Sequence, residues 1–110
     1  MRRGDIVTVA AGGGYGGKPR PAVVVQSDDF AATASLTVCL LTSHGMDAPL
    51  LRLSLTPDPG NGLTAESWIM VAKIVTVPRA KIGRMAGYRS PGDVTRLNRA
   101  LAVFLGIAGG

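Results

Sequence analysis

The sequence is poor in the residues that build metal centres and covalent cross-links. Its 110 residues include one cysteine and one histidine. Cys39 has no second cysteine for an intramolecular disulfide. Together, Cys39 and His44 fall short of the three or four ligands that a zinc site takes from the protein. The G-x-S-x-G pattern of a serine hydrolase is also missing. We therefore expect neither a bound metal nor another cofactor.

Long apolar runs are missing as well. The longest strongly apolar stretch, residues 68–77, is interrupted by Lys73 and is shorter than the roughly 20 residues that cross a bilayer. Near the N-terminus, Asp5 comes before any long apolar run, so no secretion signal is expected. These absences predict a protein of the reducing cytoplasm that has no membrane partner.

The composition is sufficient for one compact domain. Apolar residues make up 46% of the chain, which allows a single core without cross-links. Fifteen glycines and seven prolines indicate many turns between short elements and favour a β-rich fold over a helix bundle. We expect residues 1–110 to form one domain.

The net charge of +5 is distributed unevenly along the chain. Residues 1–27 and 73–99 are basic, whereas residues 28–66 carry five acids and Arg52 alone among the bases. A surface with concentrated positive charge attracts polyanions, although many basic proteins use charge only for solubility. Nucleic acid is therefore a candidate partner.

Alternating or continuous β-branched and apolar residues predict a series of short strands. Polar residues end the third of them at Thr42, and Asn61-Gly62 is typical of a tight turn. The predicted strands cover residues 5–10, 22–26, 36–41, 50–55, 67–77 and 82–85.

The C-terminal residues carry the signals of one helix. Ser90 is a good N-cap, Pro91 suits the first helical position, and Asp93 can meet free amide groups. Gly106 is a suitable stop. The order of elements predicts an antiparallel β-barrel closed by this helix. The residues expected on its sheet-facing side are Val94, Leu97, Leu101, Phe104 and Leu105.

The glycine-rich segment matches two nucleotide-binding motifs, but the residues that follow it do not fit either kind of site. Residues 12–17 satisfy G-x-G-x-x-G, and residues 12–18 satisfy G-x-x-x-x-G-K. A phosphate loop needs a hydroxyl residue after the lysine and then a helix, whereas Pro19 and a predicted strand follow here.

Five segments in order resemble the MazF/PemK toxin family. The resemblance covers nearly the whole chain and implies a fold of the CcdB/PemK type, mainly β, in which small SH3-like barrels form a homodimer. It also implies sequence-selective cleavage of single-stranded RNA and neutralisation by a cognate antitoxin. The matching segments are residues 3–7, 17–26, 38–43, 61–63 with 73–77, and 100–106.

The family's catalytic arginine and threonine fall on Arg20 and Thr42. One residue is inserted between Gly17 and Arg20, and Ala72 stands where a polar or acidic residue is common, so this chain departs from the pattern at two places. Glycines and Tyr15 replace the serine and acidic residue that family members often carry in the preceding loop, so substrate choice could differ. The residues predicted to bind RNA are Tyr15, Gly17, Lys18, Ser43 and His44.

The implied reaction is attack of an RNA 2′-hydroxyl on the adjacent phosphate, which gives a 2′,3′-cyclic phosphate and a 5′-hydroxyl. Arg20 suits the phosphate because its planar fork stays charged and meets two oxygens, and the same permanent charge makes it a poor general base. Thr42 would position or polarise the phosphate. His44 can transfer protons, although the resemblance gives it no part.

Each of these residues also has a purely structural interpretation. Arg20 could be a loop charge paired with Asp28 or Asp29, and Thr42 a hydroxyl bonded to backbone at a strand end. Cys39 is most simply a small buried side chain, and Trp68 is expected in a core or interface rather than as a platform for RNA bases.

Two other function classes remain open. A CcdB-like toxin would poison gyrase by protein contact through its C-terminal helix and leave RNA intact. A noncatalytic SH3-like module would retain RNA or peptide without cutting RNA. The Arg-Pro and Leu-Thr-Ser segments favour the nuclease, whose antitoxin we expect to be acidic and partly disordered, because it competes with RNA for the same charges.

Overall fold

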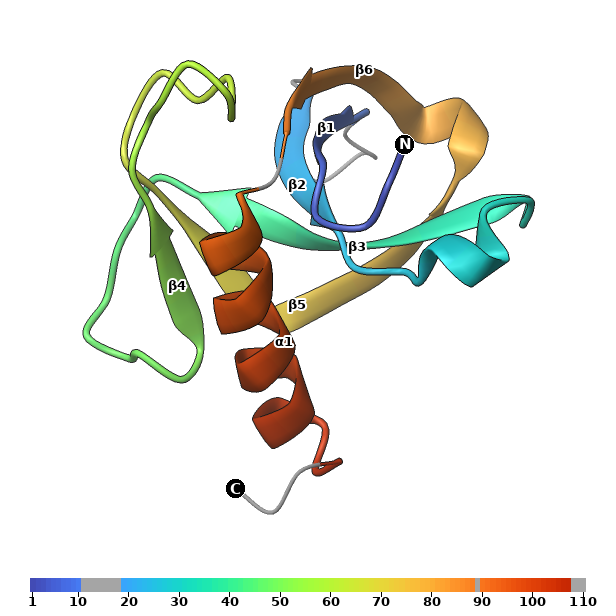
Figure 1. The fold of residues 1–110 in the computed structure, drawn as a ribbon. Coiled ribbons are helices and arrows are strands. Elements are labelled where there is room, and N and C mark those ends of the chain that lie inside the picture. The colour runs from blue at the N-terminus through green and yellow to red at the C-terminus, as the bar shows by residue number, and fades with distance from the viewer. Residues whose placement is uncertain (11–18, 89, 108–110) are drawn as a thin grey trace.

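The computed structural model describes residues 1–10, 19–88 and 90–107 (Figure 1). Two short 3-10 helices, at Asp28–Phe30 and Arg79–Lys81, connect the main elements. The strands and the α-helix are β1 (Ile6–Val9), β2 (Arg20–Val24), β3 (Ser35–Thr42), β4 (Arg52–Leu55), β5 (Ser67–Pro78), β6 (Ile82–Gly87) and α1 (Pro91–Phe104).

The six strands form one antiparallel sheet in the order β4-β5-β3-β2-β1-β6. The sheet curls strongly, and α1 lies across one side of it (Figure 1). It is not closed, because β4 and β6 stand at its two ends, but the curl agrees with a small barrel-like fold. The predicted mainly β architecture with a C-terminal helix is confirmed.

Two apolar clusters lie on opposite faces of the sheet, because successive side chains of a strand point to opposite sides. In β1, for example, Ile6 belongs to one cluster and Val7 and Val9 to the other. Leu97 and Leu101 of α1 cover the first cluster. We expected the strand at residues 22–26 to be buried on both faces. This is confirmed, since Ala22 and Val24 lie in one cluster and Val23 lies in the other.

Helix α1 begins as predicted and ends close to the predicted stop. The Ser90 hydroxyl accepts from the Asp93 amide at 3.1 Å, and Gly106 follows the helix with φ +74°. The prediction that Phe104 and Leu105 face the sheet is wrong, since they are 43% and 54% exposed. The last turn of α1 extends beyond the sheet (Figure 1), so no strand lies under it.

Cys39 is fully buried in β3, as expected. Burial raises the pKa of its thiol from 9.0 to about 11, and the positive charge of Arg3 offsets this only in part. The thiolate is the reactive form, so at pH 8 we expect an aromatic disulfide reagent to label the native protein very slowly and the denatured protein at once. The Cys39→Ser variant is the blank, and rapid labelling of the native protein would contradict the burial.

The same shift predicts a loss of stability at high pH. The folded state keeps the Cys39 proton up to about pH 11, whereas the unfolded thiol ionises near its ordinary pKa of about 8.5–9. Between these two values the unfolded state binds fewer protons, so the free energy of unfolding falls as pH rises. Cys39→Ser should lack this part of the pH dependence in denaturant titrations.

Candidate active site

The pairing of β2 with β3 brings Arg20 and Thr42 together. Ala22 lies opposite Leu40, and Val23 lies opposite Cys39. Continuing this antiparallel register by two residues places Arg20, the first residue of β2, across from Thr42, the last residue of β3. Side chains of directly opposed residues have Cβ atoms about 4.5–5.5 Å apart. By this extension of the register, a residue with a guanidinium and one with a hydroxyl lie at the same end of the sheet.

Both residues line an open groove of about 480 Å³. Its walls come from strand ends and from the segment that precedes β5, so residues distant in the chain meet there. Arg84 of β6 and Thr8 of β1 form the side next to β2. The remaining lining residues are Pro21, Leu41, Ser43, His44, Gly62, Leu63, Thr64, Ala65, Ser67 and Ala86.

The Thr42 hydroxyl is oriented by the turn that follows β3. Its Oγ1 accepts a hydrogen bond from the His44 amide at 3.1 Å, an arrangement common where a hydroxyl residue begins a turn. Because Oγ1 acts as acceptor there, its own hydrogen remains available to a second acceptor. Thr42 is half-buried and Ser43 is exposed.

Trp68 and Arg52 both contact the turn that follows β3. Trp68 lies opposite Thr42 in β5, and its ring packs so closely on Gly45 that a Cβ at that position would come within 2.4 Å of it. The Arg52 guanidinium donates to the His44 carbonyl at 3.2 Å. Trp68 is half-buried against this turn, which agrees with the packing role expected from the sequence.

The opposite wall of the groove is the segment 61–65, which is tied to the sheet through Asn61. This side chain is 5% exposed; its amide nitrogen donates to the Thr56 carbonyl at 2.8 Å, and its Oδ1 accepts from the Leu63 amide at 3.0 Å. Gly62 has φ +69°, a conformation that glycine adopts without strain. The predicted Asn61-Gly62 turn is confirmed.

The groove is lined by basic and neutral groups. Arg20 and Arg84 supply two guanidiniums. All seven acidic residues of the chain lie in the described part, and none of them lines the groove. Asp28, one of the acids considered as a partner of Arg20, accepts from the Arg3 amide at 2.7 Å and lies 3.9 Å from Arg2. Such a surface favours an anionic, extended ligand.

The model of PemK-like, MazF-like toxins of type II toxin-antitoxin systems matches residues 2–105. The chain belongs to this family. It is also 51% identical over 109 residues to a curated relative from Mycolicibacterium smegmatis named "Probable endoribonuclease MazF", covering 99% of this chain and 100% of that protein. The family predicted from the sequence is confirmed.

Solved structures of family members share the fold. A mycobacterial endoribonuclease in complex with its cognate antitoxin superposes with a TM-score of 0.79 at 23% identity, over 100% of this chain and 99% of that chain. The MazF chain of a MazE-MazF structure from Deinococcus radiodurans gives 0.78 at 17% identity, over 98% and 97%.

In this family member, the groove contains four of the site residues expected from the sequence and others that were not expected. Arg20, Thr42, Ser43 and His44 all line it. Tyr15, Gly17 and Lys18 lie outside the described residues. Sequence reasoning missed Arg84, which was visible only as one of many bases in residues 73–99. The other missed lining residues are Thr8, Pro21, Leu41, Gly62, Leu63, Thr64, Ala65, Ser67 and Ala86.

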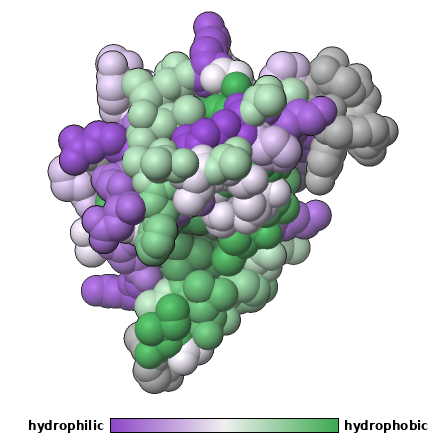
Figure 2. Space-filling view, turned by 90° about the vertical axis from the view of Figure 1, so that its right-hand side faces the viewer, coloured by the Kyte–Doolittle hydropathy of each residue, from purple (hydrophilic) through white to green (hydrophobic). Residues whose placement is uncertain are grey.

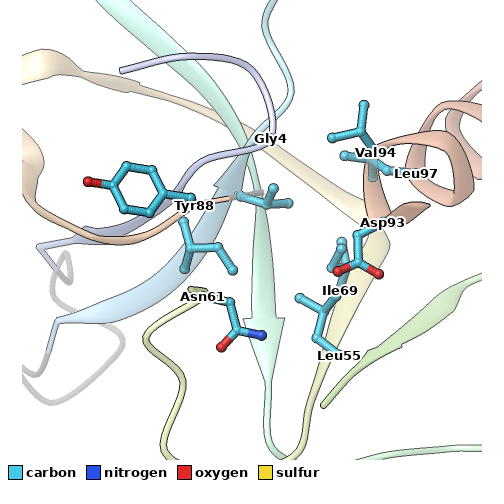
Figure 3. A pocket seen from close by; sticks show the side chains of 10 residues that line it. Gly4, Leu55, Asn61, Ile69, Tyr88, Asp93, Val94 and Leu97 are labelled. Carbon is cyan, nitrogen blue, oxygen red and sulfur yellow. The ribbon is translucent and has the colours of Figure 1, made fainter. Parts of the chain in front are cut away.

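A second cavity, at the junction of α1 with the sheet, is a packing gap rather than a site. Its volume is about 20 Å³, close to the smallest space that holds one water molecule. Figure 3 shows Leu55, Ile69 and Leu97 around it, with Asn61 and Asp93 at its edge. Of the predicted site residues that the structure describes, none lines it.

Within residues 1–10, 19–88 and 90–107, no group of three or more His, Cys, Asp and Glu side chains is placed to hold a metal ion. Among the same residues, no helix combines the length and the apolar character of a membrane span.

Proposed function

We propose that the protein is a toxin endoribonuclease that cuts single-stranded RNA in this groove, with Arg20 and Thr42 as its catalytic residues. The observation that carries the proposal is that Arg20, at the start of β2, and Thr42, at the end of β3, line one groove that has no carboxylate in its lining. The 51% identical relative named as a probable endoribonuclease supports the same activity.

The chemistry follows from the two side chains. The RNA 2′-oxygen attacks the adjacent phosphorus, the bond to the 5′-oxygen breaks, and the products carry a 2′,3′-cyclic phosphate and a 5′-hydroxyl. Arg20 holds two nonbridging oxygens and neutralises the charge that grows on them. Thr42 donates its hydroxyl hydrogen to one of these oxygens, while the His44 amide holds its Oγ1 in place. Charge stabilisation by protein groups of this kind lets the reaction proceed without a metal.

Arg84 extends the positive surface along the groove. Its exposed side chain belongs to β6, so it lies on the far side of β1 from Arg20. We place a flanking phosphate of the RNA there, with Ser43 near the bases and Tyr15, Gly17 and Lys18 as further RNA contacts. Single-stranded RNA suits an open groove because its bases are free to turn toward the protein.

The antitoxin is proposed to be an acidic, partly disordered segment that covers the same charges. Two of the solved structures contain a toxin together with a partner. One is the mycobacterial endoribonuclease in complex with its cognate antitoxin, and the other is MazE-MazF from Deinococcus radiodurans. An acidic chain would exclude RNA by charge as well as by bulk. Cellular RNA as substrate would place the protein in the cytoplasm.

The apolar surface around the end of α1 supports a homodimer. Phe104 and Leu50 border a groove of about 410 Å³ on one side of the helix. Leu105 and Ile107 border another of about 370 Å³ on the other side. Figure 2 shows hydrophobic side chains gathered around this lower end of the molecule. Contiguous apolar patches of this kind mark protein interfaces, so we place the second subunit here.

A cleavage assay on purified RNA in EDTA tests the function. The wild-type protein should produce fragments with 5′-hydroxyl ends, which a polynucleotide kinase labels without prior phosphatase treatment. Thr42→Val removes only the hydroxyl and should lower kcat by about 10²-fold, a typical loss for one donor to a developing oxyanion.

Thr76→Val is the matched control for this assay, because Thr76 is an exposed β5 residue outside the groove lining. Its kcat should equal that of the wild type. If RNA is retarded on a gel but never shortened, the protein is a binding module and not a nuclease. Unchanged kcat in Thr42→Val would remove Thr42 from the catalytic pair.

A further inference from the structure

The proposed cleavage needs a group that protonates the departing 5′-oxygen, and the groove offers few candidates. None of the chain's acids lines it. Arg20 and Arg84 hold their protons too tightly to release them readily at neutral pH, and the hydroxyls of Thr42 and Ser43 do so as well. His44, the single histidine of the chain, carries the type of side chain that exchanges a proton between pH 5 and 8.

The structure fixes the main chain of His44, and this exposed residue lines the groove. The His44 amide bonds to Thr42 Oγ1 at 3.1 Å, and its carbonyl accepts from Arg52 at 3.2 Å. The next residue, Gly45, packs on Trp68. His44 is exposed, lines the groove two residues after Thr42, and its ring makes no hydrogen bond to other described residues. A side chain whose backbone is fixed and whose ring makes no hydrogen bond to the described residues is suited to contact a substrate.

We propose that His44 is the general acid of the cleavage reaction, an inference that rests on the proposed function. The 2′-hydroxyl gives its proton to solvent hydroxide, and the 2′-oxygen forms a bond to phosphorus. As the bond from phosphorus to the 5′-oxygen breaks, the imidazolium of His44 gives that oxygen its proton. The neutral imidazole then takes a proton from water, which restores the hydroxide. Charge and atoms balance over the cycle.

The charges around His44 set the conditions for this role. Among the described residues, the charged groups that line the groove or bond to the turn are Arg20 from β2, Arg84 from β6 and Arg52 from β4, all positive. None of the seven acidic residues of the chain lines the groove, so the anionic group beside His44 in the complex is the bound phosphodiester.

The decisive experiment uses two forms of one RNA oligonucleotide. Its cleavage site is first located by sequencing the 5′ ends of RNA from cells that express the protein. One form carries the natural 5′-oxygen at the scissile phosphate and the other a bridging 5′-sulfur, which departs as a thiolate and needs no proton. On the oxygen substrate, His44→Ala and His44→Gln should lower kcat by about 10²-fold or more. On the sulfur substrate, both variants should match the wild type.

A pH profile gives the second readout. With the oxygen substrate, log kcat of the wild type should rise with pH and then level off where the imidazole loses its proton, whereas His44→Gln should rise without the inflection. An equal defect on both substrates, or no defect on either, overturns the general-acid role while the nuclease function stands. Failure of the wild type to cut either RNA overturns the proposed function itself. Thermal melts of both variants should match the wild type, because the side chain is exposed.

Discussion

Arg20→Ala is expected to lower kcat for RNA cleavage by about 10²–10³-fold, with the folded structure retained. Arg20 is half-buried at the start of β2 and lines the same groove as Thr42. The loss is large because the guanidinium meets the phosphate where negative charge grows as the reaction proceeds. Steady-state kinetics on a defined oligonucleotide measure the effect, and circular dichroism checks the fold.

Two further variants separate geometry from charge. Arg20→Lys keeps the charge but loses the planar fork, so it should recover only part of the activity. Arg99→Ala removes one exposed helix charge outside the groove lining and should change kcat little. If Arg20→Ala were no slower than Arg99→Ala, Arg20 would contribute only to the general charge of the protein.

Gly87→Ala and Gly62→Ala are each expected to destabilise the protein by about 3 kcal/mol or more. A Cβ on Gly87 would lie 2.1 Å from the carbonyl group of Asn61. At Gly62, the φ of +69° disfavours any side chain, and a Cβ would lie 1.9 Å from the Ala86 carbonyl oxygen. Both contacts are with backbone, which cannot rotate away, so the segment 61–65 would have to separate from β6. Urea titration measures the change.

Gly92→Ala is the control for this pair. Position 92 lies in the first turn of α1, and a Cβ there has no atom within 4 Å. Alanine should leave stability unchanged or raise it by up to about 1 kcal/mol, because it restricts the unfolded chain. Wild-type stability in Gly62→Ala and Gly87→Ala would show that the groove wall is not packed on β6 as described.

Local patterns predicted the elements well because their causes are local. Ser90, Asp93 and Gly106 act on amides and carbonyls within a few residues, and the start and end of α1 follow from them. The strand boundaries shifted by a few residues: β2 begins at Arg20 rather than Ala22, because Val9 of β1 pairs with it. That pairing involves residues far apart in the chain, and local propensity contains no information about it.

The sheet-facing side of α1 shows a limit of periodicity. The spacing of apolar residues correctly placed Leu97 and Leu101 in the core, but Phe104 and Leu105 continue the same pattern and are exposed. A pattern states which residues share a helix face, not how far the sheet extends beneath that face. Their exposure became visible only once the length of the neighbouring strands was known.

The sequence by itself determined the family, the mainly β fold with its C-terminal helix, and the positions of Arg20 shortly before one predicted strand and Thr42 directly after another. Only the tertiary structure decided that the two residues line one groove, since the antiparallel pairing of β2 with β3 brings the start of one strand to the end of the other. The pairing of β1 with β6 likewise brought Arg84 to the same groove. The physical reason is that propensity and capping act over a few residues, whereas strand register is set by how the whole core packs.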